Sequence, residues 1–124
     1  MALLSPHILI FTLNVHGLNI SIKRHRVAGW IKIQDPTICC LQGTHLSSKH
    51  KHRLRVMGWK ILFQANGKQK KVGIAILTSD KADFKIQKIM RDKEGHCIMI
   101  KGTFHKEDIT LINIYAPNTG APII

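Results

Sequence analysis

Ile8-Leu9-Ile10-Phe11-Thr12-Leu13-Asn14-Val15 decides how the chain begins to fold. This run is short, rich in β-formers and uninterrupted by charge, and it lies between Pro6 and Gly17. A continuous apolar run of this length predicts a β-strand that is buried on both faces. The strand therefore needs neighbours above and below it, and the rest of the chain must supply them.

A helix and a second strand follow within thirty residues. Ser21 is the expected N-cap, and Asp35-Pro36 is expected to end the helix, because the residue before a proline disfavours helical geometry. Helical spacing places an apolar stripe inward and a basic face outward. The stripe contains Ile20, Val27, Trp30 and Ile31, and the basic face contains Lys23, Arg24, Arg26 and Lys32. Thr37–Gln42 then predicts a second buried strand, which completes a βαβ unit.

The remaining sequence alternates β-rich runs with turn signals, a pattern that predicts antiparallel hairpins or a meander. The runs are 59–65, 72–79, 84–90, 96–101 and 109–115, and the turn signals between them include Asn66-Gly67, 92–95 and 105–108. The sequence therefore predicts an α/β fold with a short parallel start and a long antiparallel stretch. Its 124 residues suit one domain, which we take as 1–124.

Charge narrows the function classes. Lys and Arg number 19 against 7 Asp and Glu, for a formal net charge of +12, which favours polyanionic partners such as nucleic acid or an anionic membrane surface. No apolar run reaches the roughly 18 residues of a membrane span. The first fifteen residues lack the basic start and cleavage site of a signal peptide. Three cysteines without framework spacing suit a reducing compartment. We expect a nuclear or cytoplasmic protein that is not secreted.

Ten of the nineteen basic residues fall in three clusters: Lys23, Arg24 and Arg26; Lys49, Lys51, Arg53 and Arg55; and Lys68, Lys70 and Lys71. The last cluster is our candidate for phosphate binding, since several cations on one face contact a phosphate backbone well. A merely solvated surface is the alternative. Zinc is disfavoured, because the adjacent Cys39 and Cys40 cannot easily face one ion from a strand. Carboxylates are few and mostly fall at turns, so composition supplies a magnesium site poorly.

Three stretches resemble the endonuclease/exonuclease/phosphatase superfamily: 13–19, Ile38-Cys39-Cys40-Leu41-Gln42-Gly43-Thr44-His45, and Asn113-Ile114-Tyr115-Ala116-Pro117-Asn118. Further stretches at 31–36, 64–71, 91–96 and the tail 113–122 resemble the endonuclease domain of mammalian LINE retrotransposons. The resemblance implies a two-sheet α/β sandwich with magnesium-dependent DNA phosphodiesterase activity, like that of apurinic-site endonucleases and exonuclease III. Asn14 and Tyr115 would be catalytic, and Asn118 would contact DNA phosphate.

The sequence also departs from that family. Gly43 occupies the position of the metal-binding glutamate, and His16 replaces an Asn or Asp. The resemblance covers only the N-terminal half of the domain, so its later metal-site and base residues are absent. We therefore expect negligible nuclease activity, no tight Mg²⁺ binding and no metal ligands of its own. Two alternatives stay open: a non-catalytic nucleic-acid-binding module, and a translated retrotransposon relic, which Gly43 and the stop after Ile124 favour. A half sandwich is also expected to expose an inner sheet face, which would allow self-association.

Overall fold

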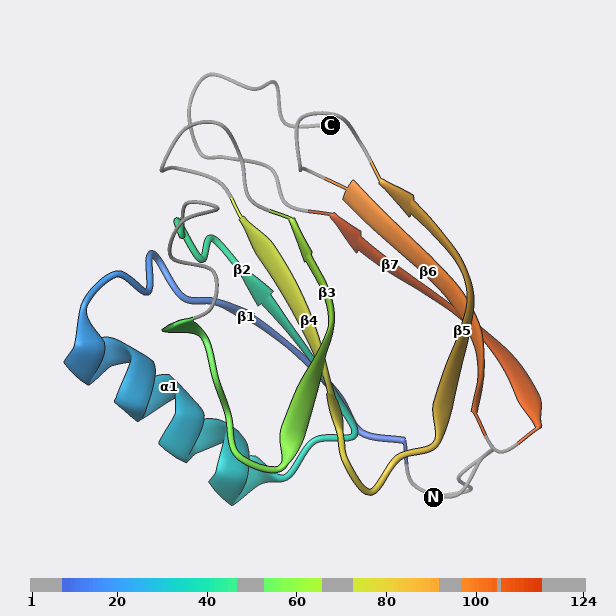
Figure 1. The fold of residues 1–124 in the computed structure, drawn as a ribbon, viewed down its shortest axis with the longest axis horizontal. Coiled ribbons are helices and arrows are strands. Elements are labelled where there is room, and N and C mark those ends of the chain that lie inside the picture. The colour runs from blue at the N-terminus through green and yellow to red at the C-terminus, as the bar shows by residue number, and fades with distance from the viewer. Residues whose placement is uncertain (1–7, 47–52, 66–72, 92–96, 105, 115–124) are drawn as a thin grey trace.

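The computed structural model describes residues 8–46, 53–65, 73–91, 97–104 and 106–114 (Figure 1). The described chain contains one helix and seven strands: β1 (Ile10–Asn14), α1 (Ser21–Gln34), β2 (Ile38–Gln42), β3 (Trp59–Ala65), β4 (Ile74–Ser79), β5 (Phe84–Arg91), β6 (Cys97–Phe104) and β7 (Glu107–Ile114). Each expected β-rich run forms a strand. No helix in these described ranges is long and apolar enough to span a membrane.

The strands form two sheets that face each other, with α1 packed on the far side of the first (Figure 1). The first sheet has the order β1-β2-β4-β3, in which only β1 and β2 are parallel. The second is the antiparallel meander β5-β6-β7. The α/β fold class, the βαβ start and the antiparallel continuation are confirmed.

The space between the sheets is filled by an apolar core. It contains Ile38, Cys40, Ile74 and Ile76 from the first sheet, and Phe84, Ile98, Ile100, Phe104 and Leu111 from the second. Burial of an aliphatic side chain stabilises a fold by about 1.5–3 kcal/mol. The expectation of an uncovered inner sheet face is wrong, because the chain supplies strands to both sheets and their inner faces cover each other. Self-association through that face therefore loses its basis.

A second core lies between the first sheet and α1. Cys39, Leu41, Ala75 and Leu77 point from the sheet toward Ile31 and the partly buried Val27 and Trp30 of the helix. The central strands β2 and β4 are thus buried on both faces. The same expectation for β1 is wrong: among the described strands β1 lies at the edge of its sheet, and its Ile10 is 43% exposed. An edge strand lacks the second neighbour that would cover it.

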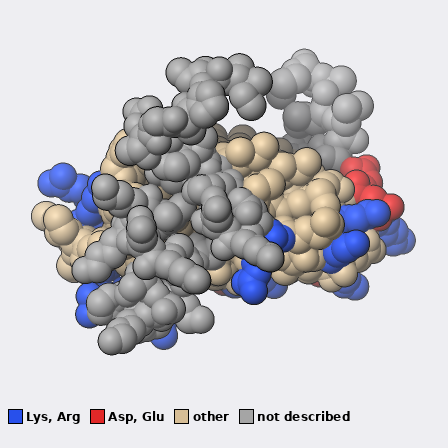
Figure 2. All heavy atoms as spheres, turned by 90° about the horizontal axis from the view of Figure 1, so that it is seen from above, with Lys and Arg blue, Asp and Glu red and all other residues tan. Residues whose placement is uncertain are grey.

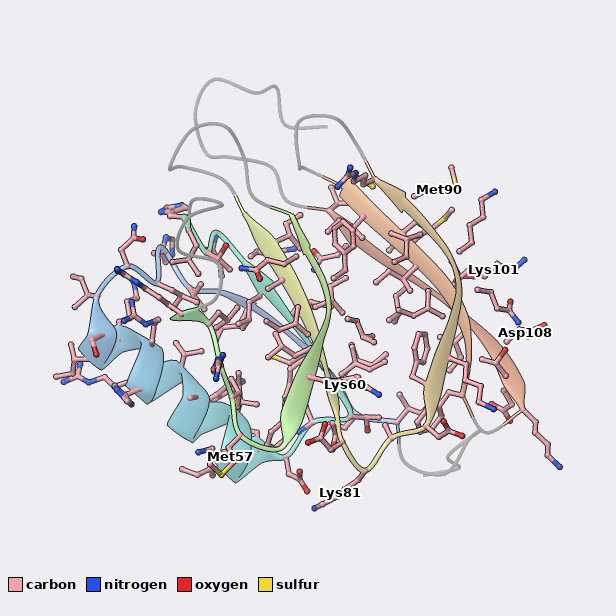
Figure 3. All side chains as sticks on the ribbon, in the orientation of Figure 1. Met57, Lys60, Lys81, Met90, Lys101 and Asp108 are labelled. Atoms are coloured by element: carbon pink, nitrogen blue, oxygen red, sulfur yellow. The ribbon has the colours of Figure 1, made fainter. Side chains whose placement is uncertain are left out.

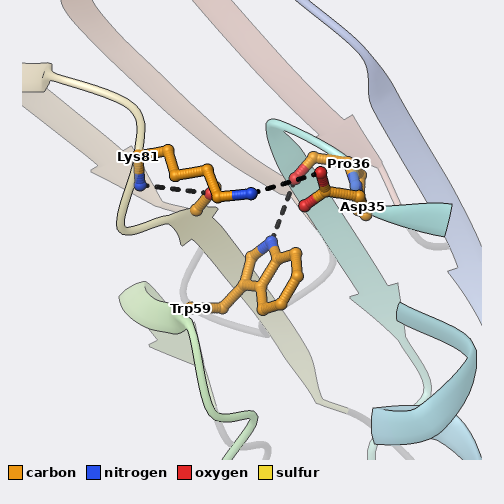
Figure 4. A network of polar contacts seen from close by, with 5 residues as sticks. Asp35, Pro36, Trp59 and Lys81 are labelled. Carbon is orange, nitrogen blue, oxygen red and sulfur yellow. Dashed lines mark hydrogen bonds and ion pairs between the residues drawn. The ribbon is translucent and has the colours of Figure 1, made fainter. Parts of the chain in front are cut away.

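The N-terminal end of helix α1 differs from the expectation, whereas its C-terminal end agrees with it. Ile20, not Ser21, is the N-cap residue; its side chain is 66% exposed and does not join the inward stripe. At the other end Asp35 adopts a left-handed conformation, and Pro36 follows it. Trp59 Nε1 donates to the Pro36 carbonyl at 3.0 Å, and Lys81 Nζ lies 3.6 Å from Asp35 Oδ2 (Figure 4). The half-buried indole hydrogen bond anchors β3 to this turn, whereas the exposed ion pair contributes little.

Candidate functional site

Three carboxamide side chains lie at one end of the sandwich. Asn14 and Gln42 are the last residues of the parallel strands β1 and β2 and are register partners, so their side chains share the face toward the second sheet. Gln42 Nε2 donates to Asn113 Oδ1 of β7 at 2.5 Å and to the Ile114 carbonyl at 2.8 Å. We call Asn14, Gln42 and Asn113 the carboxamide cluster. Within it, the bonds of Gln42 join the two sheets at the edge where β1, β2 and β7 end.

The segments that follow β1 and β2 are fastened to each other by backbone hydrogen bonds. Gly17 N donates to the Gly43 carbonyl at 2.6 Å, and Leu18 N to that of Thr44 at 2.8 Å. Gly43 N in turn donates to the Gly73 carbonyl at 2.8 Å. Gly43 has a φ of 71°, in the left-handed region that glycine adopts at little cost. The backbone beside the carboxamide cluster therefore has a left-handed conformation at position 43, which favours glycine there.

Two cations from the first turn of α1 hold the segment after β1. Lys23 Nζ donates to the His16 carbonyl at 3.0 Å. Arg24 Nη1 donates to the carbonyls of Leu18 and Asn19, both at 2.9 Å. Both side chains are half-buried rather than simply outward-facing. These cations place positive charge next to the cluster and also fix the loop that leads away from Asn14.

The second-sheet member of the cluster is buried. Asn113 is 4% exposed, and its Nδ2 makes no hydrogen bond of ordinary geometry. Burial raises the pKa of the nearby Cys40 thiol to about 11, and the Asn113 side chain opposes this shift only in part. Burial, and secondarily the neighbouring Cys40, raises the pKa of Cys39 to about 12. Both thiols therefore stay protonated at neutral pH and do not serve as nucleophiles or thiolate ligands.

The described residues do not fit a magnesium ion. Mg²⁺ prefers carboxylate, phosphate and water oxygens, and Gly43 has no side chain to offer one. Asn14 Oδ1 already accepts from His16 N at 3.1 Å, and Asn113 Oδ1 accepts from Gln42. No group of three or more His, Cys, Asp or Glu within the described ranges could hold a metal. The cluster is neutral, and its amide oxygens are largely engaged.

Of the residues proposed from the sequence, Asn14 lies at this edge and is exposed. Tyr115, Asn118, Lys68, Lys70 and Lys71 lie outside the described residues. Sequence reasoning missed Gln42 and Asn113. Part of their signal was available, because Gln42 ends an apolar strand run as Asn14 nearly does, and Asn113 is a polar residue near the end of another β-rich run.

The charged side chains of the described surface are unevenly divided. On the face that Figure 2 shows, Lys and Arg lie at several places, whereas the visible Asp and Glu side chains lie at one end. This distribution provides several cationic approaches to the surface. It does not by itself select one of them.

Solved structures share this arrangement of helix and sheets. A truncated TDP2 from Caenorhabditis elegans matches 91% of the chain with a TM-score of 0.66 and 19% identity. An AP endonuclease from Archaeoglobus fulgidus matches 88% with a TM-score of 0.58 and 22% identity. A D. rerio TDP2 complexed with single-strand DNA product matches 90% with a TM-score of 0.62 and 15% identity.

The fold is of the endonuclease/exonuclease/phosphatase type. The chain spans less than half the length of these three structures, covering 47%, 41% and 47% of them. No family model matches the chain. The fold expected from the motifs is confirmed, and the endonuclease/exonuclease/phosphatase-type architecture places the carboxamide cluster at the end of its paired sheets.

Proposed function

We propose that this chain contacts the phosphate backbone of DNA but does not hydrolyse it. The observation that carries the proposal is the exposed Asn14 carboxamide at the end of β1, which lies beside the Gln42–Asn113 pair with no carboxylate of the described residues next to it. Carboxamides and cations hydrogen-bond to phosphate oxygens without repelling them. Metal-assisted cleavage needs an ion for charge neutralisation and an activated nucleophile, and the described residues hold neither the ligand set nor a base for it.

Individual residues take roles by position in this proposal. Asn14 is exposed at the edge, Tyr115 is the residue after β7 in the sequence, and Asn118 follows three residues later. We assign Asn14 and Tyr115 to the phosphate that a nuclease of this fold would cleave, and Asn118 to a neighbouring phosphate. Lys68, Lys70 and Lys71 provide a cationic cluster of their own after β3.

The origin that we propose is the endonuclease domain of a LINE retrotransposon. Its support is the series of matching stretches, above all Tyr115-Ala116-Pro117-Asn118 and the Gln42-Gly43-Thr44 segment. A nuclear or cytoplasmic location accords with the free cysteines Cys39, Cys40 and Cys97. A relic without selected function is the second candidate, favoured by the glycine at position 43.

DNA binding is tested by fluorescence anisotropy of a labelled oligonucleotide titrated in EDTA at several salt concentrations. We expect binding without metal, and a logarithmic affinity that falls linearly with the logarithm of salt. The triple change Lys68→Ala, Lys70→Ala, Lys71→Ala should weaken binding more than the charge-matched control Lys85→Ala, Lys88→Ala, Lys101→Ala on the second sheet. Equal losses would mean that net charge alone attracts DNA, with no defined interface.

Catalysis is tested separately by nicking of supercoiled plasmid in Mg²⁺. We expect no nicking above that of the Asn14→Ala variant. Metal-dependent nicking that Asn14→Ala abolishes would overturn the non-catalytic assignment. Urea unfolding distinguishes the relic from a DNA-binding module. A gradual response without a cooperative transition would mean that the chain has no unique folded state, which would favour the relic and argue against any specific DNA contact.

A further inference from the structure

A groove of about 800 Å³ runs beside β3, which is separated from β2 of the carboxamide cluster by strand β4. One wall is the segment 54–58, and the other is the strand from Trp59 to Gln64. The lining is mainly apolar and includes Leu54, Val56, Met57, Leu62 and Phe63. Met57 is 82% exposed, and Figure 3 shows its side chain on the outer surface of the molecule. The groove therefore offers apolar contacts at an accessible place.

Strand β3 is the last of the described strands in its sheet. The order β1-β2-β4-β3 gives it one partner among the described strands, β4, so its other edge is not paired within them. Its register shifts between Ile61 and Phe63, which leaves Leu62 as a bulge. An unpaired edge presents a row of backbone N–H and C=O groups that can receive another extended chain.

The aromatic rings of this strand are already engaged. Trp59 packs against the core beneath α1 and donates its indole N–H to the Pro36 carbonyl. Phe63 packs against the core between the sheets. A nucleic-acid strand in such a groove would depend on stacking of bases on exposed rings. Since both rings are committed to cores, a polypeptide backbone fits the groove better than a series of bases.

The charge of this region favours an acidic occupant. Residues 36–79 contain no Asp or Glu but eight Lys or Arg. Arg55 lines the groove itself, Arg53 is exposed two residues before it, and Lys60 is exposed on β3 (Figure 3). The same charges oppose pairing of β3 with the β3 of a second copy, because like charges would meet across that interface.

We propose that the groove binds an extended acidic peptide, which adds a strand to the edge of β3 that no described strand pairs. The peptide backbone would pair with Trp59–Ala65, so five to seven of its residues would be held. Its apolar side chains would enter the groove beside Leu62 and Met57, and its carboxylates would face Arg55. The proposal does not depend on DNA binding, since the carboxamide cluster lies at the end of other strands.

The probe is a fluorescein-labelled eight-residue peptide that alternates glutamate and valine, with anisotropy as the readout. Two peptide controls separate the contributions. N-methylation of every second amide blocks main-chain hydrogen bonds in one register, and replacement of glutamate by lysine reverses the charge. We expect the parent peptide to bind, one of the two N-methylated registers to lose binding, and the lysine peptide not to bind.

The protein variant is Arg55→Glu, and the matched control is Lys85→Glu, an exposed residue of β5 with the same change of charge. We expect Arg55→Glu to weaken peptide binding about tenfold or more, and Lys85→Glu to change it much less. Circular dichroism and the urea midpoint verify that both variants fold.

Several results would overturn the proposal. Equal weakening by the two variants would mean long-range charge attraction without a groove. Unchanged binding by both N-methylated peptides would exclude strand addition. Binding of a labelled single-stranded oligonucleotide that Arg55→Glu abolishes, with no peptide binding, would make the groove a nucleic-acid surface instead.

An Asn14→Ala variant that loses DNA binding but keeps peptide binding would show that the two sites are separate.

Discussion

The contact that joins the two sheets at the candidate site makes the sharpest stability prediction. Gln42→Met keeps the length of the side chain but removes the donor to Asn113 Oδ1 and the Ile114 carbonyl. Ile114 is 65% exposed, and water can replace that bond, but Asn113 is 4% exposed and its oxygen would stay unpaired. An unpaired buried acceptor costs about 1–3 kcal/mol. We therefore expect a loss of about 2 kcal/mol.

Urea unfolding measures this loss. With a denaturant slope of about 1–3 kcal/mol per molar, the midpoint should fall by about 1 M at an unchanged slope. The control is Gln87→Met, which removes a 2.9 Å bond from Gln87 Nε2 to Thr103 Oγ1 on an exposed strand face. It should cost less than about 0.5 kcal/mol. The double variant Gln42→Met, Asn113→Leu replaces both partners and should regain about 1 kcal/mol. Equal costs for Gln42→Met and Gln87→Met, or strict additivity in the double variant, would refute the reasoning.

Two further predictions concern the neighbouring backbone and the buried thiols. Gly73 has a φ of 142°, and a Cβ there would clash with Thr44 Oγ1, so Gly73→Ala should cost about 2–4 kcal/mol by urea unfolding. Adding Thr44→Ala to this variant should relieve the clash but not the backbone strain. No relief in the double variant would contradict the close approach of these two residues. The thiols of Cys39 and Cys40 have raised pKa values of about 12 and 11 in the folded chain, against 9.0 for an ordinary thiol. As the pH rises above 9, the unfolded chain therefore loses these protons before the folded chain does, and the free energy of unfolding should fall by about 1.4 kcal/mol per thiol at pH 10. Cys39→Val should make this decline less steep in unfolding measured as a function of pH.

The sequence predicts local structure here because each strand is a compact β-rich run between turn residues. It does not predict which strands become neighbours across the sandwich. The runs at 10–14 and 38–42 have similar composition, yet β1 is an edge strand and β2 is central, since burial depends on partners that lie elsewhere in the chain. The division of the hairpins between two sheets has the same origin. Because the hairpins divide between two sheets, the inner faces of the sheets cover each other, and the expectation of an exposed inner face was wrong for this reason.

The candidate site was predictable only in part for a related reason. Asn14 was identified through a resemblance, but Gln42 and Asn113 are separated by 71 residues and meet only because β2 and β7 end at the same edge of facing sheets. Likewise, periodicity placed Lys23 and Arg24 on an outward helix face. In the structure they bend back to the carbonyls after β1, because those carbonyls lie over the first turn of α1.

The conformation of Gly43 determines whether the missing carboxylate could simply be restored. Gly43→Glu would place an L-residue at φ 71°, which costs about 1–2 kcal/mol, and Gly43→Ala has the same strain without the carboxylate. Both variants should therefore lose similar stability by urea unfolding. The hydrogen bonds from Gly17 N to Gly43 O and from Gly43 N to Gly73 O oppose relaxation of this backbone. We accordingly expect 10 mM Mg²⁺ to leave the difference between the two midpoints unchanged, since an ion that bound only the folded Gly43→Glu chain would stabilise it alone. A magnesium-dependent rise for Gly43→Glu and not for Gly43→Ala would show instead that one side chain separates this edge from a metal site.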